Sequence, residues 1–211
     1  MRVASFLGRK GGVGKTTNAH ATAHGLNMVG IPAAYVMTDD RELLSDEKRV
    51  YSIIDGRTVP QLEKASVTAR QHTGTGVMVM DGGGNRAVVD DLLASVSDVI
   101  ILPFTADDDS VYVVAADLVR FPKAFALPSN WPTNSKAASI DAGYIEKLQA
   151  RFSGRILPPV LSTHSIRDFL LNEFSGALLP PAQRYCRTIA RQVAELLDSV
   201  PEQTGRLEKV A

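Results

Sequence analysis

The sequence predicts an α/β fold, with a mostly parallel, twisted sheet covered by helices on both faces. Short apolar runs alternate with longer segments of helical periodicity along nearly the whole chain, and turns rich in glycine or carboxylates follow several of these runs. The 211 residues, of which 45% are hydrophobic, can bury one sizeable core. We therefore expect a single domain over residues 1–211, with a flexible tail at 201–211.

The composition excludes several classes of function. The formal net charge is zero and the pI is about 6.9, so contact with nucleic acid or membrane must come from a local patch. No apolar run approaches the roughly 18 residues of a membrane span, and the N-terminus lacks a signal-peptide pattern, so we expect a cytoplasmic protein. The single cysteine, Cys186, excludes internal disulfides and multi-cysteine metal clusters, and we expect it to pack in the core.

A glycine-rich turn between a strand and a helix is the most informative stretch. The apolar run at 3–7 leads into Gly-Arg-Lys-Gly-Gly-Val-Gly-Lys-Thr-Thr, and an alanine-rich helix at 16–28 follows. Glycines let a ligand approach the backbone N–H groups, and the helix adds the positive end of its dipole, which suits phosphate. In the P-loop pattern Lys15 reaches the β and γ phosphates and the Thr16 hydroxyl binds Mg²⁺, although Arg9 replaces the leading glycine.

The octapeptide Lys-Gly-Gly-Val-Gly-Lys-Thr-Thr at 10–17 resembles the deviant Walker A motif of the ParA/MinD family, P-loop ATPases of the SIMIBI type. The resemblance implies that ATP and Mg²⁺ bind here, and that catalytic Lys10 reaches across an ATP-sandwiched homodimer to the partner's phosphates. Partition ATPases of this group often lack the leading glycine, so Arg9 is compatible with the family. The nucleotide-binding residues implied by the motif are Gly11, Gly12, Val13, Gly14, Lys15, Thr16 and Thr17.

The second strand, expected at 31–37, ends at Thr38, Asp39 and Asp40, where ligands bind in an open α/β sheet. By the family resemblance this segment is switch I, and Asp40 matches the catalytic aspartate that positions or activates the attacking water. Thr38 stands where the family has its first aspartate, which puts part of the Mg²⁺ shell in question. Asp39 is either a shifted substitute or a helix cap, and a cap or surface role is also the alternative for Asp40.

A second carboxylate follows a buried strand. The run Val-Met-Val-Met at 77–80 ends in Asp81 and three glycines. This is the Walker B arrangement, in which Asp81 and Thr16 place Mg²⁺, and it resembles switch II of the family. A turn or a helix cap is the alternative for Asp81. Asn85 and Arg86 follow, either within reach of the phosphates or the partner, or as an ordinary helix start.

The remaining elements continue the alternation. Three aspartates at 107–109 precede a helix and are expected to stabilise its N-terminus rather than bind calcium. A long surface loop is expected at 121–139, with Trp131 as a local anchor or a partner contact. His20 and His24 share a helix face without an evident third ligand, so we expect packing or a polar surface role rather than metal binding. We expect strands at 50–54, 98–103 and 155–161 and helices at 60–71, 88–96, 110–119, 142–152 and 182–197.

The last third of the chain carries further candidates. In the related ATPases the residues after the last strand and a later proline-containing loop flank the adenine, which by position points to Thr163 and Pro180. Arg184, Arg187 and Arg191 lie at spacings of three and four on the last helix and form a basic stripe. Such a stripe is usually a solvated face, but in partition ATPases basic residues of the C-terminal helices bind non-specific DNA.

The resemblance as a whole implies a ParA-like, Mg²⁺-dependent ATPase with slow, partner-stimulated turnover. Its ATP-bound homodimer would bind DNA non-specifically, and hence the nucleoid, until a ParB-like or other activating protein releases it, in plasmid or chromosome partition or plasmid stability. No membrane partner is expected, because the C-terminus lacks the apolar-basic amphipathic helix that anchors MinD to lipid. Two rivals stay open: an ATP-dependent ligase of the dethiobiotin-synthetase type, and a nucleotide-binding scaffold with little hydrolysis.

Overall fold

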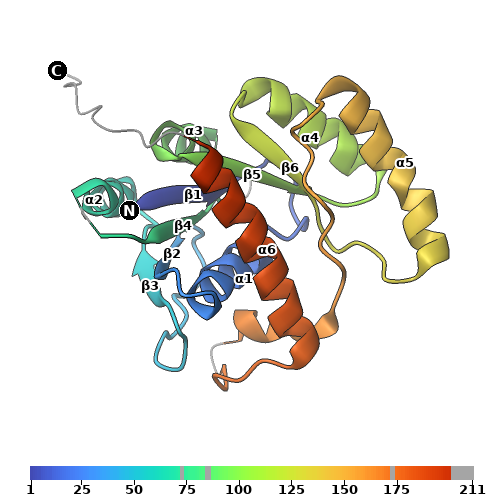
Figure 1. Cartoon of the computed structure of the whole chain (residues 1–211). Coiled ribbons are helices and arrows are strands. Elements are labelled where there is room, and N and C mark those ends of the chain that lie inside the picture. The colour runs from blue at the N-terminus through green and yellow to red at the C-terminus, as the bar shows by residue number, and fades with distance from the viewer. Residues whose placement is uncertain (72–73, 84–86, 172–173, 201–211) are drawn as a thin grey trace.

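Six parallel strands form the sheet of the computed structural model (Figure 1), which describes residues 1–71, 74–83, 87–171 and 174–200. Their spatial order is β3-β2-β4-β1-β5-β6, and every pairing is parallel. The predicted α/β class with a parallel sheet is confirmed. The strands are β1 (Arg2–Phe6), β2 (Ala33–Met37), β3 (Ser52–Asp55), β4 (Val77–Asp81), β5 (Val99–Phe104) and β6 (Ala124–Pro128).

Helices cover both faces of the sheet, as predicted, and each face has its own hydrophobic core. One core is shared by α1 (Lys15–Met28), the 3₁₀ helix η1 (His164–Leu170) and α6 (Pro180–Ser199). The other is shared by α2 (Val59–Gln71), α3 (Ala87–Val96), α4 (Asp108–Arg120) and α5 (Ser135–Arg151). None of the described helices is both long enough and apolar enough to cross a membrane.

The register of three neighbouring strands builds the functional edge of the sheet. Asp81 at the end of β4 is paired with Phe6 of β1 on one side and with Met37 of β2 on the other. β4 is buried along its whole length, which explains its continuous apolar run. Because the strands are parallel, the segments that follow all three emerge at the same edge. The P-loop, Asp81 and Thr38 therefore meet there.

α1 lies between the sheet and α6 (Figure 1) and is buried on nearly all sides. Gly25 permits the close approach of the two helices, since a Cβ at this position would lie 2.0 Å from the carbonyl oxygen of Cys186. Cys186 is buried in this contact, as predicted. His20 and His24 are also buried against aromatic rings, and the described residues contain no group of three or more potential metal ligands. Their predicted packing role is confirmed.

The predicted surface loop at 121–139 is wrong. Its first part is β6, which is largely buried and pairs with β5, and α5 begins soon afterwards behind the N-cap residue Asn134. Pro128 suggested a loop, but it ends the strand, where a missing N–H is tolerated. Trp131 is 3% exposed and packs edge-on against Phe104, with ring centroids 6.4 Å apart. It is a local anchor and not a partner contact.

The predicted strand at 155–161 is also wrong in part. The segment lies along β6 and exchanges backbone hydrogen bonds with it, but it forms only isolated bridges. Pro158 and Pro159 have no N–H to donate, so a continuous ladder cannot form. β6 is therefore the last full strand on this side of the sheet.

The acidic run before α4 has the predicted role. Asp107 is the N-cap residue, and its side chain accepts a hydrogen bond of 2.8 Å from the backbone amide of Ser110. Asp108 and Asp109 lie in the first turn, where negative charge interacts favourably with the helix dipole. The run therefore stabilises the start of α4.

We expect Gly25→Ala to destabilise the protein by about 3 kcal/mol, because the added methyl group would overlap a backbone carbonyl and force α1 away from α6. Thermal denaturation measures the loss. Gly143→Ala in α5 is the matched control, since nothing lies within 4 Å of a Cβ added there, and alanine favours the helix by about 0.5–1 kcal/mol. Equal effects at the two positions would contradict the close packing of α1 on α6.

Candidate nucleotide-binding site

The P-loop presents an open stretch of backbone beside the start of α1. Gly12 and Gly14 have φ angles of 77° and 94°, a left-handed conformation that a side chain would strain. A Cβ on Gly11 or Gly12 would meet nothing within 4 Å, whereas Val13 is buried and anchors the loop. Bare backbone next to a helix N-terminus is the arrangement that phosphate groups require.

Lys15 points back into the loop. The residue is 7% exposed, and its Nζ donates a hydrogen bond of 2.7 Å to the carbonyl oxygen of Lys10. Burial lowers the pKa of the ammonium group, and the neighbouring carboxylates oppose this effect. These carboxylates belong to Asp81, Asp90, Asp117 and Asp39. The loop thus holds a buried cation that an anionic ligand would meet.

Two acidic residues of α4 hold the front of the loop. The buried carboxylate of Asp117 accepts hydrogen bonds from Nε of Arg9 at 2.7 Å and from its backbone amide at 3.2 Å. Asp109, about two turns earlier on the same helix, forms an ion pair with Lys10. Arg9 therefore replaces the leading glycine of the motif with a side chain that ties the loop to α4.

Asp81 is fully buried at the end of β4. Its Oδ2 accepts a hydrogen bond of 2.8 Å from the Tyr35 hydroxyl, whereas Oδ1 has no hydrogen-bond partner of good geometry among the described residues. Burial raises the pKa of this carboxyl to about 6. Hydrogen bonds from the hydroxyls of Tyr35 and Thr16 and the charges of Arg41 and Lys15 oppose this rise. A buried carboxylate beside the Thr16 hydroxyl, with one oxygen unused among the described residues, fits Mg²⁺. This cation takes few protein oxygens and completes its shell with water and phosphate.

Thr38 joins the ends of β2 and β4. Its buried hydroxyl donates a hydrogen bond of 2.5 Å to the carbonyl oxygen of Asp81 and accepts one of 3.1 Å from the amide of Gly83. A threonine thus stabilises the backbone that follows Asp81, at the position where the family that the sequence resembles has an aspartate. Asp39 is half-buried and Asp40 is exposed.

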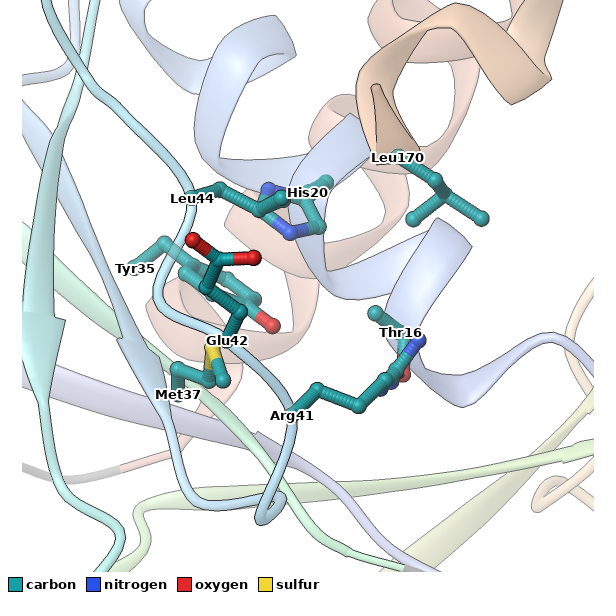
Figure 2. A pocket seen from close by; sticks show the side chains of 8 residues that line it. All are labelled: Thr16, His20, Tyr35, Met37, Arg41, Glu42, Leu44 and Leu170. Carbon is teal, nitrogen blue, oxygen red and sulfur yellow. Dashed lines mark hydrogen bonds between the residues drawn. The ribbon is translucent and has the colours of Figure 1, made fainter. Parts of the chain in front are cut away.

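Arg41, in the segment that follows β2, lies beside Thr16 (Figure 2). Its guanidinium donates hydrogen bonds of 2.9 Å to Oγ1 of Thr16 and 2.7 Å to Asp39. It therefore brings a positive charge to the hydroxyl that the motif assigns to Mg²⁺. Beside it lies a cavity of about 70 Å³, room for roughly two water molecules. The cavity is lined by Thr16, His20, Tyr35, Met37, Arg41, Glu42, Leu44 and Leu170.

Asp90 of α3 is a second buried carboxyl near the loop. It is fully buried, and neither of its oxygens has a hydrogen-bond partner among the described residues. A Cβ on Gly82 would lie 3.2 Å from Oδ1 of Asp90, which places this carboxyl against the segment that follows β4. Burial raises its pKa to about 6, and the charges of Lys15 and Arg120 oppose the rise.

The other predicted site residues lie on separate elements. Thr163 is the half-buried residue before η1, and Pro180 is exposed in the first turn of α6 instead of in a loop. Asn85, Arg86 and the third glycine of switch II lie outside the described residues. Three arginines are exposed on α6, as a stripe requires: Arg184, Arg187 and Arg191.

Sequence reasoning missed four side chains that build the site: Tyr35, Arg41, Asp90 and Asp117. A signal existed for three of them. A tyrosine within an apolar strand needs a partner for its hydroxyl, and an aspartate on the apolar face of a helix is seldom buried without a partner. Arg41 gives no such signal, because it belongs to a charged run that reads as surface.

The comparison with solved structures identifies the fold. The MinD cell division protein of Aquifex aeolicus superposes with a TM-score of 0.70 over 92% of this chain and 97% of that chain, at 13% identity. The fold is that of the MinD/ParA-type P-loop ATPases. The predicted P-loop fold is thereby confirmed.

Two further neighbours have this fold and differ in their named functions. A putative plasmid partition protein of Borrelia burgdorferi, bound to AMPPNP, has a TM-score of 0.62 at 12% identity and covers 94% of this chain and 98% of its own. Cobyrinic acid a,c-diamide synthase of Mycobacterium smegmatis, with bound ADP and magnesium, has a TM-score of 0.65 at 14% identity and covers 94% and 96%. No protein-family model and no curated protein matches the sequence.

We expect Asp90→Asn to stabilise the protein more at pH 8 than at pH 4.5. The pKa of Asp90 is about 6 in the folded protein, above its ordinary value of 3.8. The folded state therefore binds more protons than the unfolded state between these values, and stability falls as the pH rises through this window. Asparagine removes the buried negative charge that Asp90 carries above this pH window.

Thermal denaturation of the variant at the two pH values measures this gain. Asp91→Asn on the same helix is the control, because Asp91 is exposed and pairs with Arg120, so its effect should be small. A gain from Asp90→Asn that is equal at both pH values would contradict the raised pKa.

Proposed function

We propose that the chain is a Mg²⁺-dependent ATPase that dimerises around ATP and acts as a nucleotide-controlled switch. The observation that carries this proposal is the fully buried Asp81 carboxylate, which lies near the Thr16 hydroxyl and the Lys15 cation at one edge of the sheet. Its Oδ1 has no hydrogen-bond partner of good geometry among the described residues. Phosphoryl transfer depends mainly on such positioning and charge stabilisation. The neighbours solved with AMPPNP and with ADP and magnesium support the same ligands for this chain.

Each residue has a defined role in the proposed reaction. The loop backbone at 11–17 and Lys15 would bind the phosphates, and Thr16 with Asp81 would hold Mg²⁺, which offsets the negative charge on the phosphate oxygens. Asp40 would orient the attacking water. Asp40 is exposed in the segment that follows β2.

Lys10 would contact the phosphates of the partner subunit. In the single chain it forms an ion pair with Asp109. Dimerisation would exchange this pair for a contact with phosphate, and exposed ion pairs contribute little to stability. The position of Lys10 at the open front of the loop supports this exchange.

We propose DNA as the surface that the ATP-bound dimer binds. Arg184, Arg187 and Arg191 are exposed on α6, and arginine contacts with the phosphate backbone need no base recognition. The plasmid partition protein among the neighbours supports a role in partition or plasmid stability. A ParB-like or other activating protein would then stimulate hydrolysis, and the dimer would associate with the nucleoid until that step.

Two rival functions are less well supported. The first is an ATP-dependent ligase on the same fold, which would need a substrate pocket near Asp40 and Asp81. Cobyrinic acid a,c-diamide synthase, solved with ADP and magnesium, has this fold. The second rival is a scaffold with little hydrolysis, which is suggested by Thr38 at the position where the resembled family has an aspartate. ATP turnover that is unchanged by Asp40→Ala would favour the scaffold.

We expect Lys15→Ala to weaken nucleotide binding about a hundredfold, because it removes a buried cation that is hydrogen-bonded within the loop. Lys10→Ala should leave binding nearly unchanged and reduce ATP turnover. Fluorescent nucleotide titration and phosphate release measure the two effects. Equal loss of binding in both variants would contradict the division of roles between these lysines.

We expect the triple variant Arg184/Arg187/Arg191→Ala to lose ATP-dependent retention on DNA while its ATP binding stays intact, because the stripe lies on the outer side of α6. Retention on immobilised non-specific DNA is measured with and without ATP, over a range of salt. The matched triple Arg→Lys variant keeps the charge and should retain most of the binding. Unaltered retention by the alanine variant would return the stripe to ordinary solvated surface.

A further inference from the structure

A buried tyrosine holds the carboxylate of Asp81. Tyr35, in the middle of β2, is 1% exposed, and its hydroxyl donates a hydrogen bond of 2.8 Å to Oδ2 of Asp81. β2 and β4 are neighbours in the sheet, and Tyr35 is paired with Val79, two residues before Asp81. The tyrosine side chain therefore runs along the sheet towards the functional edge and meets the carboxylate there.

Tyr35 is itself fixed by a chain of contacts that leads away from the site. Its ring stacks on the imidazole of His20, with ring centroids 3.7 Å apart and an interplanar angle of 21°. Nδ1 of His20 lies 2.8 Å from the Tyr51 hydroxyl, and Nη1 of Arg49 donates to that hydroxyl at 3.1 Å. All of these side chains are buried. These contacts hold the Tyr35 ring in one orientation.

The donors and acceptors among these side chains show where each hydrogen-bonding proton lies. Arg49 can only donate, so the Tyr51 oxygen accepts from it and donates its own proton to Nδ1 of His20. Burial, with the charges of Arg49 and Arg41, lowers the pKa of His20 to about 3, so its ring is neutral and Nδ1 is free to accept. A neutral ring stacked on Tyr35 adds no charge beside Asp81.

The hydrogen bond from Tyr35 decides which oxygen of Asp81 is available. Oδ2 is taken by the hydroxyl, and Oδ1 has no hydrogen-bond partner of good geometry among the described residues. A carboxylate with one oxygen fixed cannot rotate freely about its last bond. The remaining oxygen is then presented in a single direction, and the Thr16 hydroxyl lies close to the same carboxylate.

We propose that Tyr35 is a positioning residue for magnesium, which fixes the Asp81 carboxylate through Oδ2 and leaves Oδ1 for the water shell of the cation. This inference rests on the proposed function of the site. Groups that orient a metal-binding carboxylate typically change metal affinity by about tenfold or more when they are removed. Tyr35 should therefore affect the magnesium-dependent part of nucleotide binding and not the magnesium-free part.

The test compares the affinity for a fluorescent ATP analogue with Mg²⁺ and with EDTA. Tyr35→Phe keeps the ring on His20 and removes only the hydroxyl, and we expect it to lower the enhancement of affinity by Mg²⁺ about tenfold while affinity in EDTA stays unchanged. Tyr51→Phe is the matched control, because it removes a buried hydroxyl from the same chain and leaves the Tyr35–Asp81 hydrogen bond in place. It should retain most of the enhancement, because the stacking of Tyr35 on His20 does not involve the lost hydroxyl.

A second comparison isolates the action through Asp81. In an Asp81→Asn background, adding Tyr35→Phe should change the enhancement by Mg²⁺ no further, because the carboxylate it orients is gone. Should the single Tyr35→Phe variant not fold, the double variant still allows the inference to be contradicted, since it buries no unpaired charge. An unchanged enhancement in Tyr35→Phe, or a further loss in the double variant, would overturn the inference. A wild-type chain that binds no nucleotide would instead contradict the proposed function itself.

Discussion

The register of three parallel strands determines where every group of the candidate site lies. The pairing of Asp81 with Phe6 on one side and Met37 on the other brings the P-loop, the carboxylate and Thr38 to one edge of the sheet. A shift of one residue in β4 would turn Asp81 to the opposite face. Such a shift would also exchange the valine and methionine side chains of β4 between the two closely packed cores. The interactions that stabilise the core and those that shape the site are therefore the same.

Buried charge is concentrated at this edge. Lys15, Asp81, Asp90 and Asp117 are all less than 9% exposed, and two of the carboxylates have oxygens without a hydrogen-bond partner among the described residues. Such groups cost stability unless a ligand or an ion completes them. The ion pair of Asp117 with Arg9 offsets part of this loss of stability. An arrangement of this kind is typical of a site made for a charged ligand.

The sequence was sufficient for the fold class, the P-loop and the buried strand before Asp81, because these depend on local spacing and on apolar runs. It failed where tertiary context decides. The prolines around β6 read as a loop, although Pro128 only ends a strand, and the apolar run at 155–161 read as a strand, although Pro158 and Pro159 interrupt its ladder. Tyr35 was not singled out, because its partner lies 46 residues away in the sequence.

The central claim is that ATP and magnesium join two copies of this chain. The most direct measurement is the mass in solution by sedimentation velocity, with Mg²⁺ and a non-hydrolysable ATP analogue and again with EDTA and no nucleotide. We expect the 22.7 kDa mass of one chain without nucleotide, and twice that mass with Mg²⁺ and the analogue. A chain that binds the nucleotide at saturation and still sediments as a monomer would contradict it.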